Sequence, residues 1–280
     1  MALFKRTPLA PLEYSRTWWL RSWVTLVMVF LYAPLVVLMA FSFNDSKRNV
    51  VWRGFTTKYY EKAWNDSTLI EALGNSLTIA ALSTLFSLVL GTLAAIMLWR
   101  FRFPFKSAVD GVISLPIIVP EICLGVAFLI FFAAVDWPTG LPWPFSLSAI
   151  TIAHITFSFP FVTMVVRSRL TSFNREQEEA AKDLGANEWQ AFRDVLLPHI
   201  RPALIAGALM AFTLSLDDFV ITFFTAGPDT ITFPVKVYSM VRFSVSPVVN
   251  AASTVLIIMT VVLTAVALRY QGIKSIAESH

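Results

Sequence analysis

The stretch NREQEEAAKDLGANEWQAFRDVLLP, residues 174–198, is the longest charge-rich segment of a chain that is otherwise mostly apolar. It predicts two short helices with a bend between them. Asn174 and Asn187 stand where helix N-caps are expected, each with a glutamine three residues later. Gly185 stands where a left-handed C-terminal cap is expected. Pro198 is expected to disfavour helix at the residue before it.

The two predicted helices offer different faces. In the second, Trp189, Phe192 and Val195 recur at about helical spacing, which predicts one apolar face and one wet face. In the first, Ala180 and Ala181 are small enough for another surface to approach closely. A helix pair of this kind, placed between two membrane spans, is expected to be a docking site for another protein.

The composition indicates an integral membrane protein. Of the 280 residues, 56% are hydrophobic and 14% are charged, and the mean hydropathy is +0.67. Soluble domains rarely reach such values, and several charge-free runs are long enough to cross a bilayer. The net charge of +4 comes from basic residues in loops that flank the spans, so it does not indicate nucleic-acid binding.

The apolar runs predict an all-α membrane protein with a bundle of six transmembrane helices. The predicted spans are 22–43, a part of 72–99, 111–135, 148–166, 202–225 and 247–268. The third is interrupted by Pro116 and Pro120. Segment 1–21 is predicted to be a cytoplasmic lead-in, 22–270 the six-span transmembrane domain, and 271–280 a cytoplasmic tail. Segments 44–71, 136–147 and 226–246 are predicted to be external loops.

The distribution of basic residues gives the orientation. With the N-terminus in the cytoplasm, 15 of the 22 Lys and Arg residues fall on inside segments and seven on outside segments. Both termini are therefore expected in the cytoplasm. The loop 174–198 is then cytoplasmic as well.

The spacing within this loop resembles the EAA loop of ABC importer permeases. Glu179, Ala180 and Ala181 are followed after three residues by Gly185, and after nine more by VLLP at 195–198. That family has EAA, three residues, Gly, nine residues and Ile-x-Leu-Pro, so Val195 stands where Ile is usual. The alternative interpretation is an ordinary amphipathic cytoplasmic loop.

This resemblance implies the fold of a type I ABC importer permease with a cytoplasmic coupling helix pair. It also implies that the loop contacts a separate ATPase subunit. The ATPase-coupling residues carried over from the motif are Glu179, Ala180, Ala181, Gly185, Leu197 and Pro198. No GxxxxGK[ST] stretch occurs, so no nucleotide cofactor is expected in this chain, and ATP and Mg are expected on the partner subunits. No His/Cys cluster has metal-binding spacing.

Three acidic residues lie inside predicted spans: Glu121 near mid-membrane, and Asp217 with Asp218 in the outer half. A carboxylate there costs about 2.5–3.5 kcal/mol on insertion scales. Each acid has a structural interpretation, in which it pairs with Ser, Thr or backbone groups at a helix break. As a set with no basic partner in the spans, they favour a pathway for a cation. His154 is either a buried hydrogen-bonding residue or a pathway residue.

Further segments resemble spermidine/putrescine permeases, especially those of the C type. They are LYAP at 31–34, FSFNDS at 41–46, PEI at 120–122, FTLSLDD at 212–218 with Gly227-Pro228, and Ser246-Pro247 with Asn250-Ala251. Residues 252–254, AST, depart from the usual LAT. The resemblance implies a bacterial inner-membrane importer with a second permease chain as heterodimer partner, two ATP-binding subunits and an extracytoplasmic solute-binding protein.

Two alternatives to a polyamine importer follow from the same residues. Related permeases for iron, opines or amino-acid-like solutes share parts of these segments. An intramembrane enzyme with Asp217 and Asp218 as an aspartyl dyad is the alternative from another class. Adjacent residues on a helix diverge by about 100°, whereas dyad acids converge from separate elements, and this geometry opposes the enzyme.

Overall fold

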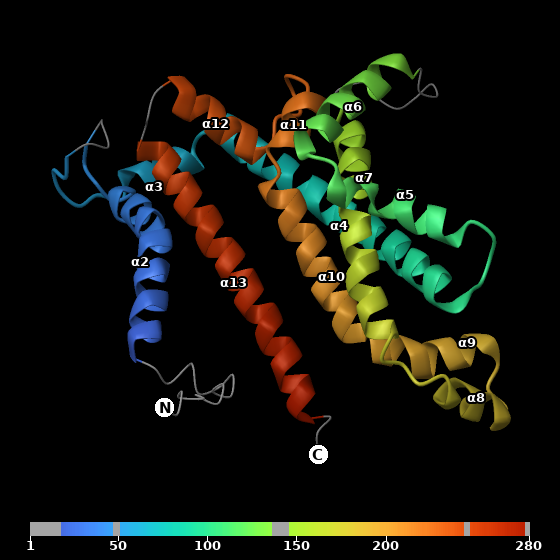
Figure 1. Cartoon of the computed structure of the whole chain (residues 1–280). Coiled ribbons are helices and arrows are strands. Elements are labelled where there is room, and N and C mark those ends of the chain that lie inside the picture. The colour runs from blue at the N-terminus through green and yellow to red at the C-terminus, as the bar shows by residue number, and fades with distance from the viewer. Residues whose placement is uncertain (1–17, 47–50, 136–145, 244–246, 278–280) are drawn as a thin grey trace, which may run out of the picture. The chain divides into compact units, whose positions relative to one another are not determined.

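The computed structural model describes residues 18–46, 51–135, 146–243 and 247–277 (Figure 1). Within these ranges the chain is helical, apart from connecting turns and an isolated bridge between Asn44 and Phe55. Most of the predicted N-terminal segment and of the predicted turn 136–147 lies outside the described residues. Two compact units make up the chain: residues 1–63 with 245–255, and residues 64–244 with 256–280.

The first unit contains helix α2 (Trp18–Phe41), which matches the first predicted span. It is apolar around its whole circumference and none of its residues is buried, as expected of a helix that faces lipid. The segment after it is not simply a loop, because α3 (Lys58–Trp64) forms within it. Asn44 holds the turn before α3: its amide donates to the carbonyl of Val51 at 2.8 Å and accepts from the N–H of Arg53 at 2.8 Å.

Three long helices, α4 (Ser67–Arg100), α7 (Leu147–Leu170) and α10 (Leu197–Asp217), pack together in the second unit (Figure 1). Small residues allow the close approach, as expected for helices in lipid. A Cβ atom on Gly91 would lie 2.7 Å from Val162 Cβ and 2.8 Å from the carbonyl oxygen of Phe159. Glycine is therefore required where α4 crosses α7.

The third predicted span is not one straight helix. It consists of α5 (Lys106–Ile118) and α6 (Glu121–Ala134), which meet at an angle of 107°. The break lies at Val119 and Pro120, because proline has no N–H to continue the helical ladder. The depth of Glu121 was estimated from a straight helix, so that estimate does not apply to this bent pair, and the depth stays a prediction.

The expected helix end before Pro198 is also wrong. The helices α9 (Glu188–Ala191) and α10 are joined by a π-helical turn, η1 (Phe192–Leu196), into one 30-residue helix, Glu188–Asp217. The N–H of Leu197 donates to the carbonyl of Phe192, five residues back. The wider turn accommodates the proline, as π-bulges do within α-helices.

The helix of the predicted fifth span ends at Asp217, and a short helix, α11 (Val220–Thr225), follows after a break of two residues. The predicted polar loop 226–246 contains a helix, α12 (Phe233–Phe243). It is held to α4 by bonds from Asn75 Nδ2 to the carbonyl of Ile231 (3.1 Å) and from the N–H of Phe233 to Ser76 Oγ (2.9 Å).

The last helix, α13 (Pro247–Ala277), continues through most of the predicted tail 271–280. Among the described residues, four helices are long and apolar enough to cross a membrane: α2, α4, α7 and Glu188–Asp217. The bent pair α5–α6 makes a fifth if it is one span, and the apolar part of α13, Pro247–Val262, is shorter. The count of six spans stays a prediction.

Candidate functional site

The charge-rich loop is built from two short helices whose ends are closed by local hydrogen bonds. Helix α8 (Glu176–Asp183) ends in a Schellman motif, with Gly185 at a φ of +94°. The N–H of Gly185 donates to the carbonyl of Lys182 at 2.9 Å, and that of Ala186 to the carbonyl of Ala181 at 3.0 Å. The predicted left-handed cap is confirmed.

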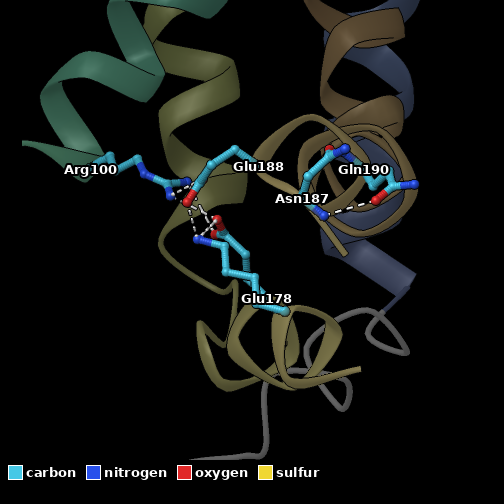
Figure 2. A network of polar contacts seen from close by, with 6 residues as sticks. Arg100, Glu178, Asn187, Glu188 and Gln190 are labelled. Atoms are coloured by element: carbon cyan, nitrogen blue, oxygen red, sulfur yellow. Dashed lines mark hydrogen bonds and ion pairs between the residues drawn. The ribbon is translucent and has the colours of Figure 1, made fainter. Parts of the chain in front are cut away.

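The predicted cap at Asn187 is confirmed, whereas the N-cap position of α8 is Arg175, which makes no side-chain cap bond. Asn187 and Gln190 form a reciprocal capping box, in which each side-chain oxygen accepts from the other residue's N–H at 2.9 and 2.8 Å (Figure 2). Asn174 Oδ1 accepts from the N–H of Glu176, the first residue of α8, at 3.0 Å. The bend between α8 and α9 is therefore fixed by residues of the loop itself.

The helix pair exposes both charged and large apolar side chains. Leu184 is 91% exposed and Trp189 is 64% exposed, and Glu179, Ala180 and Gly185 are exposed as well. We call these five residues the docking face. Of the other motif residues, Ala181 is half-buried and Pro198 is exposed. Leu197 packs against the hydrophobic core below, as do Phe192 and Val195 of the predicted apolar face.

An ion pair ties α8 to the end of α4. The guanidinium of Arg100 donates to both carboxylate oxygens of Glu178, at 3.1 and 2.8 Å, and Glu178 is only 6% exposed (Figure 2). Arg100 also reaches Glu188 at 3.4 Å, and Lys182 donates to Glu188 at 2.7 Å. In the sequence, Arg100 is only one of the 15 basic residues of the predicted inside segments.

The pKa of Lys182 is raised above its usual value, first by the hydrogen bond to Glu188 and then by the charges of Glu188 and Glu178. A raised pKa in the folded state means that the contribution of this contact is present below the unfolded pKa. It is lost as the pH rises through the folded value. The contact is therefore intact at neutral pH.

A second contact holds the start of α8. The guanidinium carbon of Arg175 lies 4.5 Å from the ring centroid of Trp99, and Arg175 Nη2 donates to the carbonyl of Trp99 at 3.2 Å. The ring of Trp99 packs edge-on against Phe173 at 5.8 Å. Two consecutive residues at the end of α4 thus anchor α8.

The two adjacent aspartates in the fifth predicted span have different surroundings. Asp217, the last residue of α10, is exposed, whereas Asp218 is 8% exposed. The Asp218 carboxylate accepts from the N–H groups of Ile221 (3.2 Å) and Thr222 (2.8 Å) and from Thr222 Oγ1 (2.7 Å). Asp218 therefore caps α11, and the two acids do not converge as an aspartyl dyad would.

A buried hydrogen-bond chain extends from Asp218 to three other helices. His154, 2% exposed, has Nε2 at 3.0 Å from Thr222 Oγ1 and 3.3 Å from Asp218 Oδ2, and Nδ1 at 2.7 Å from Ser215 Oγ. Ser83 of α4 donates to Ser215 Oγ at 3.0 Å. His154 is therefore the buried hydrogen-bonding residue of the two alternatives given above. The chain connects α4, α7, α10 and α11.

Glu121 comes close to Asp217 because α6 packs against α11. A Cβ atom on Gly125 would lie 2.7 Å from the ring of Phe224, so the two helices touch at that glycine. Glu121 is exposed at the first turn of α6, one turn before Gly125. The two exposed acids thus lie at neighbouring helix breaks, where the bent helix pair α5–α6 approaches the break between α10 and α11.

Comparison with known proteins identifies the family of this chain. The sequence pattern of the family described as "Binding-protein-dependent transport system inner membrane component" matches residues 87–275. The chain belongs to this family. The permease is 39% identical over 242 residues to the spermidine/putrescine transport system permease protein PotC of Escherichia coli (strain K12), covering 86% of this chain and 89% of PotC. It is 41% identical over 247 residues to the putrescine transport system permease protein PotI of the same strain, covering 88% of each chain.

A solved structure supports the fold. A chain from the crystal structure of a bacterial ABC transporter that imports the acidic polysaccharide alginate matches with a TM-score of 0.70 at 15% identity, over 94% of this permease and 99% of that chain. The chain therefore has the type I ABC importer permease fold. It is a multi-pass inner-membrane transport subunit, not an enzyme, and it works with a binding protein and other subunits.

Proposed function

We propose that this permease carries polyamines into the cell and that ATP hydrolysis on partner subunits drives the transport. The observation that carries the proposal is the pair of exposed carboxylates, Glu121 and Asp217, at two helix breaks that lie close together because α6 packs on α11. The permeases of about 40% identity are named for spermidine and putrescine, which supports the same class of solute.

The chemistry of the solute explains why acids are suited to this position. A polyamine carries several positive charges, and stripping its water in an apolar path is costly. At 4 Å and an effective dielectric constant near 20, one carboxylate attracts one ammonium group by roughly 4 kcal/mol before desolvation is subtracted. Binding must remain weak enough for release. Asp218 bonds to the backbone of α11 and to His154. It would therefore contribute to the solute path by holding the helix break next to Asp217, not by binding the solute itself.

An anionic solute fits this site poorly. The two carboxylates would repel it, and its own desolvation would add to the barrier. Other cationic or amine-bearing solutes remain the second candidate, because the two acids recognise charge and not chain length.

The remaining parts of the assembly follow from the family and the docking face. We infer that the docking face, with its exposed Leu184 and Trp189, contacts an ATP-binding subunit. The complete importer then has a second permease chain, two ATP-binding subunits holding ATP and Mg, and an extracytoplasmic binding protein. Both termini of this permease lie in the cytoplasm, in keeping with the bias of basic residues toward the loops on that side.

The test is uptake of labelled putrescine and spermidine by Glu121→Gln and Asp217→Asn in the assembled importer. Each change removes charge and keeps shape, and each is expected to lower uptake roughly tenfold, which corresponds to about 1.4 kcal/mol. Glu61→Gln, an exposed acid on α3, is the matched control and should transport normally. Wild-type uptake by both variants would contradict the charged path. Uptake of neither polyamine by the assembled wild type would point to another solute.

A further inference from the structure

The loop is joined to the membrane helices in two different ways. Helix α9 continues without a break through the π-helical turn into α10, so it moves with α10. Helix α8 is separated from this rod by the bend at Gly185. Its side chains bond to the last two residues of α4, Arg100 and Trp99, and Lys182 of α8 also donates to Glu188 at the start of α9.

The attachment through Arg100 is built to hold one geometry. Glu178 is the one buried residue of α8, and its two oxygens are both engaged by the planar guanidinium. Charge-assisted bidentate pairs of this kind are strong and directional. A contact between apolar side chains could slide. The two parallel bonds from the Arg100 guanidinium to the Glu178 carboxylate cannot, so this ion pair restricts the orientation of α8 relative to α4.

Helix α4 extends from the Arg100–Glu178 ion pair to the region around Asp217, which we call the acid region. Arg100 is its last residue, and Ser83, about 26 Å along a helix with a rise of 1.5 Å per residue, donates into the His154 hydrogen-bond chain. The same helix packs closely on α7 at Gly91. One rigid element therefore contacts α8 at one end and the neighbourhood of Asp217 and Asp218 further along.

We infer that Arg100 is a positioning residue for energy coupling, which transmits a displacement of α8 to α4. The inference rests on the proposed function, in which the docking face receives the movement of an ATPase. The loop then acts on two membrane helices at once: on α10 through the covalent helix and on α4 through the ion pair. Arg100 is not part of the docking face, so its loss separates transmission from docking.

The experiment must remove both charges together. Removal of Arg100 alone leaves the buried Glu178 with Lys182, 3.5 Å away, as its remaining cationic partner. Breaking one side of a buried pair is destabilising, whereas replacing both partners by an apolar pair of similar volume is often neutral. The variant is therefore R100M/E178M, in the complete importer reconstituted into vesicles with its ATPase, partner permease and binding protein. The measurements are recovery of the ATPase, the rate of ATP hydrolysis, and the amount of putrescine transported per ATP.

We expect R100M/E178M to recover the ATPase as the wild type does and to hydrolyse ATP, while putrescine transported per ATP falls roughly fivefold or more. R100K keeps the charge but not the bidentate geometry, so its ratio should be intermediate. Arg102→Met, an exposed arginine two residues along the chain, is the control and should match the wild type.

An unchanged ratio in R100M/E178M would overturn the inference. Loss of the ATPase in that variant would overturn it as well, because Arg100 would then serve only to fold the docking face. Failure of the wild-type permease to recover any ATPase would instead contradict the proposed function, and the two failures are therefore distinct.

Discussion

The coupling loop, residues 174–198, and the acid region around Asp217 are built by different means. In the loop, the caps at Gly185 and Asn187 are made by partners at most five residues away. In the acid region, His154 bonds to residues 61 and 68 positions away, and Ser83 to a residue 132 positions away. Local hydrogen bonds follow from spacing in the sequence, whereas the acid region exists only after the helices have packed.

This difference explains what the sequence predicted in the loop. Short polar side chains and glycine have specific roles at helix ends, so the capping box at Asn187 and the left-handed Gly185 were predictable. The ion pair of Arg100 with Glu178 was not, because the partners are 78 residues apart. One signal was present: Glu178 lies three residues before Ala181, on the same helix face, and a carboxylate on an inward face needs a cation.

In the acid region, the sequence predicted the presence of the acids but not their roles. The free-energy cost of a carboxylate in a membrane makes all three acids candidates for a functional role. Only the packing of the helices shows that Asp218 is buried and Asp217 exposed. Hydropathy also could not give the 107° bend between α5 and α6 or the continuation of the helix through Pro198. Both depend on how the chain satisfies backbone groups around a proline, for which a bend and a π-turn are alternative solutions.

The largest loss of stability is expected from Asp218→Asn. The amide can accept from one side only, so one of the donors at Ile221 and Thr222 loses its acceptor inside the protein. An unsatisfied buried group costs roughly 1–3 kcal/mol. The thermal midpoint of the purified permease in detergent should fall, and Asp217→Asn, on an exposed neighbour, should leave it unchanged. Equal midpoints for the two variants would remove the distinction between the buried and the exposed acid.

A smaller and local effect is expected from Gly185→Ala. No atom would contact the added Cβ, so the cost is the left-handed backbone alone, about 1 kcal/mol. Gly74→Ala is the matched control, because its Cβ also meets no atom and it lies within α4, where alanine is favoured by about 1 kcal/mol. Gly185→Ala should therefore lower stability and Gly74→Ala should raise it. The measurements are the sensitivity of the loop to proteolysis and the thermal midpoint of the permease. A gain in stability at Gly185 would show that its backbone conformation imposes no strain.

The coupling loop is expected to dock the ATPase, and the acid region is expected to carry the solute. The most direct measurement compares Gly185→Val with Asp217→Asn in the same reconstituted importer, recording ATPase recovered and putrescine taken up. Gly185→Val is expected to lose ATPase and uptake together, because the cap that shapes the docking face is strained. Asp217→Asn is expected to keep the ATPase and its hydrolysis while uptake falls roughly tenfold. Full ATPase recovery by Gly185→Val, or wild-type uptake by Asp217→Asn, would contradict the claim.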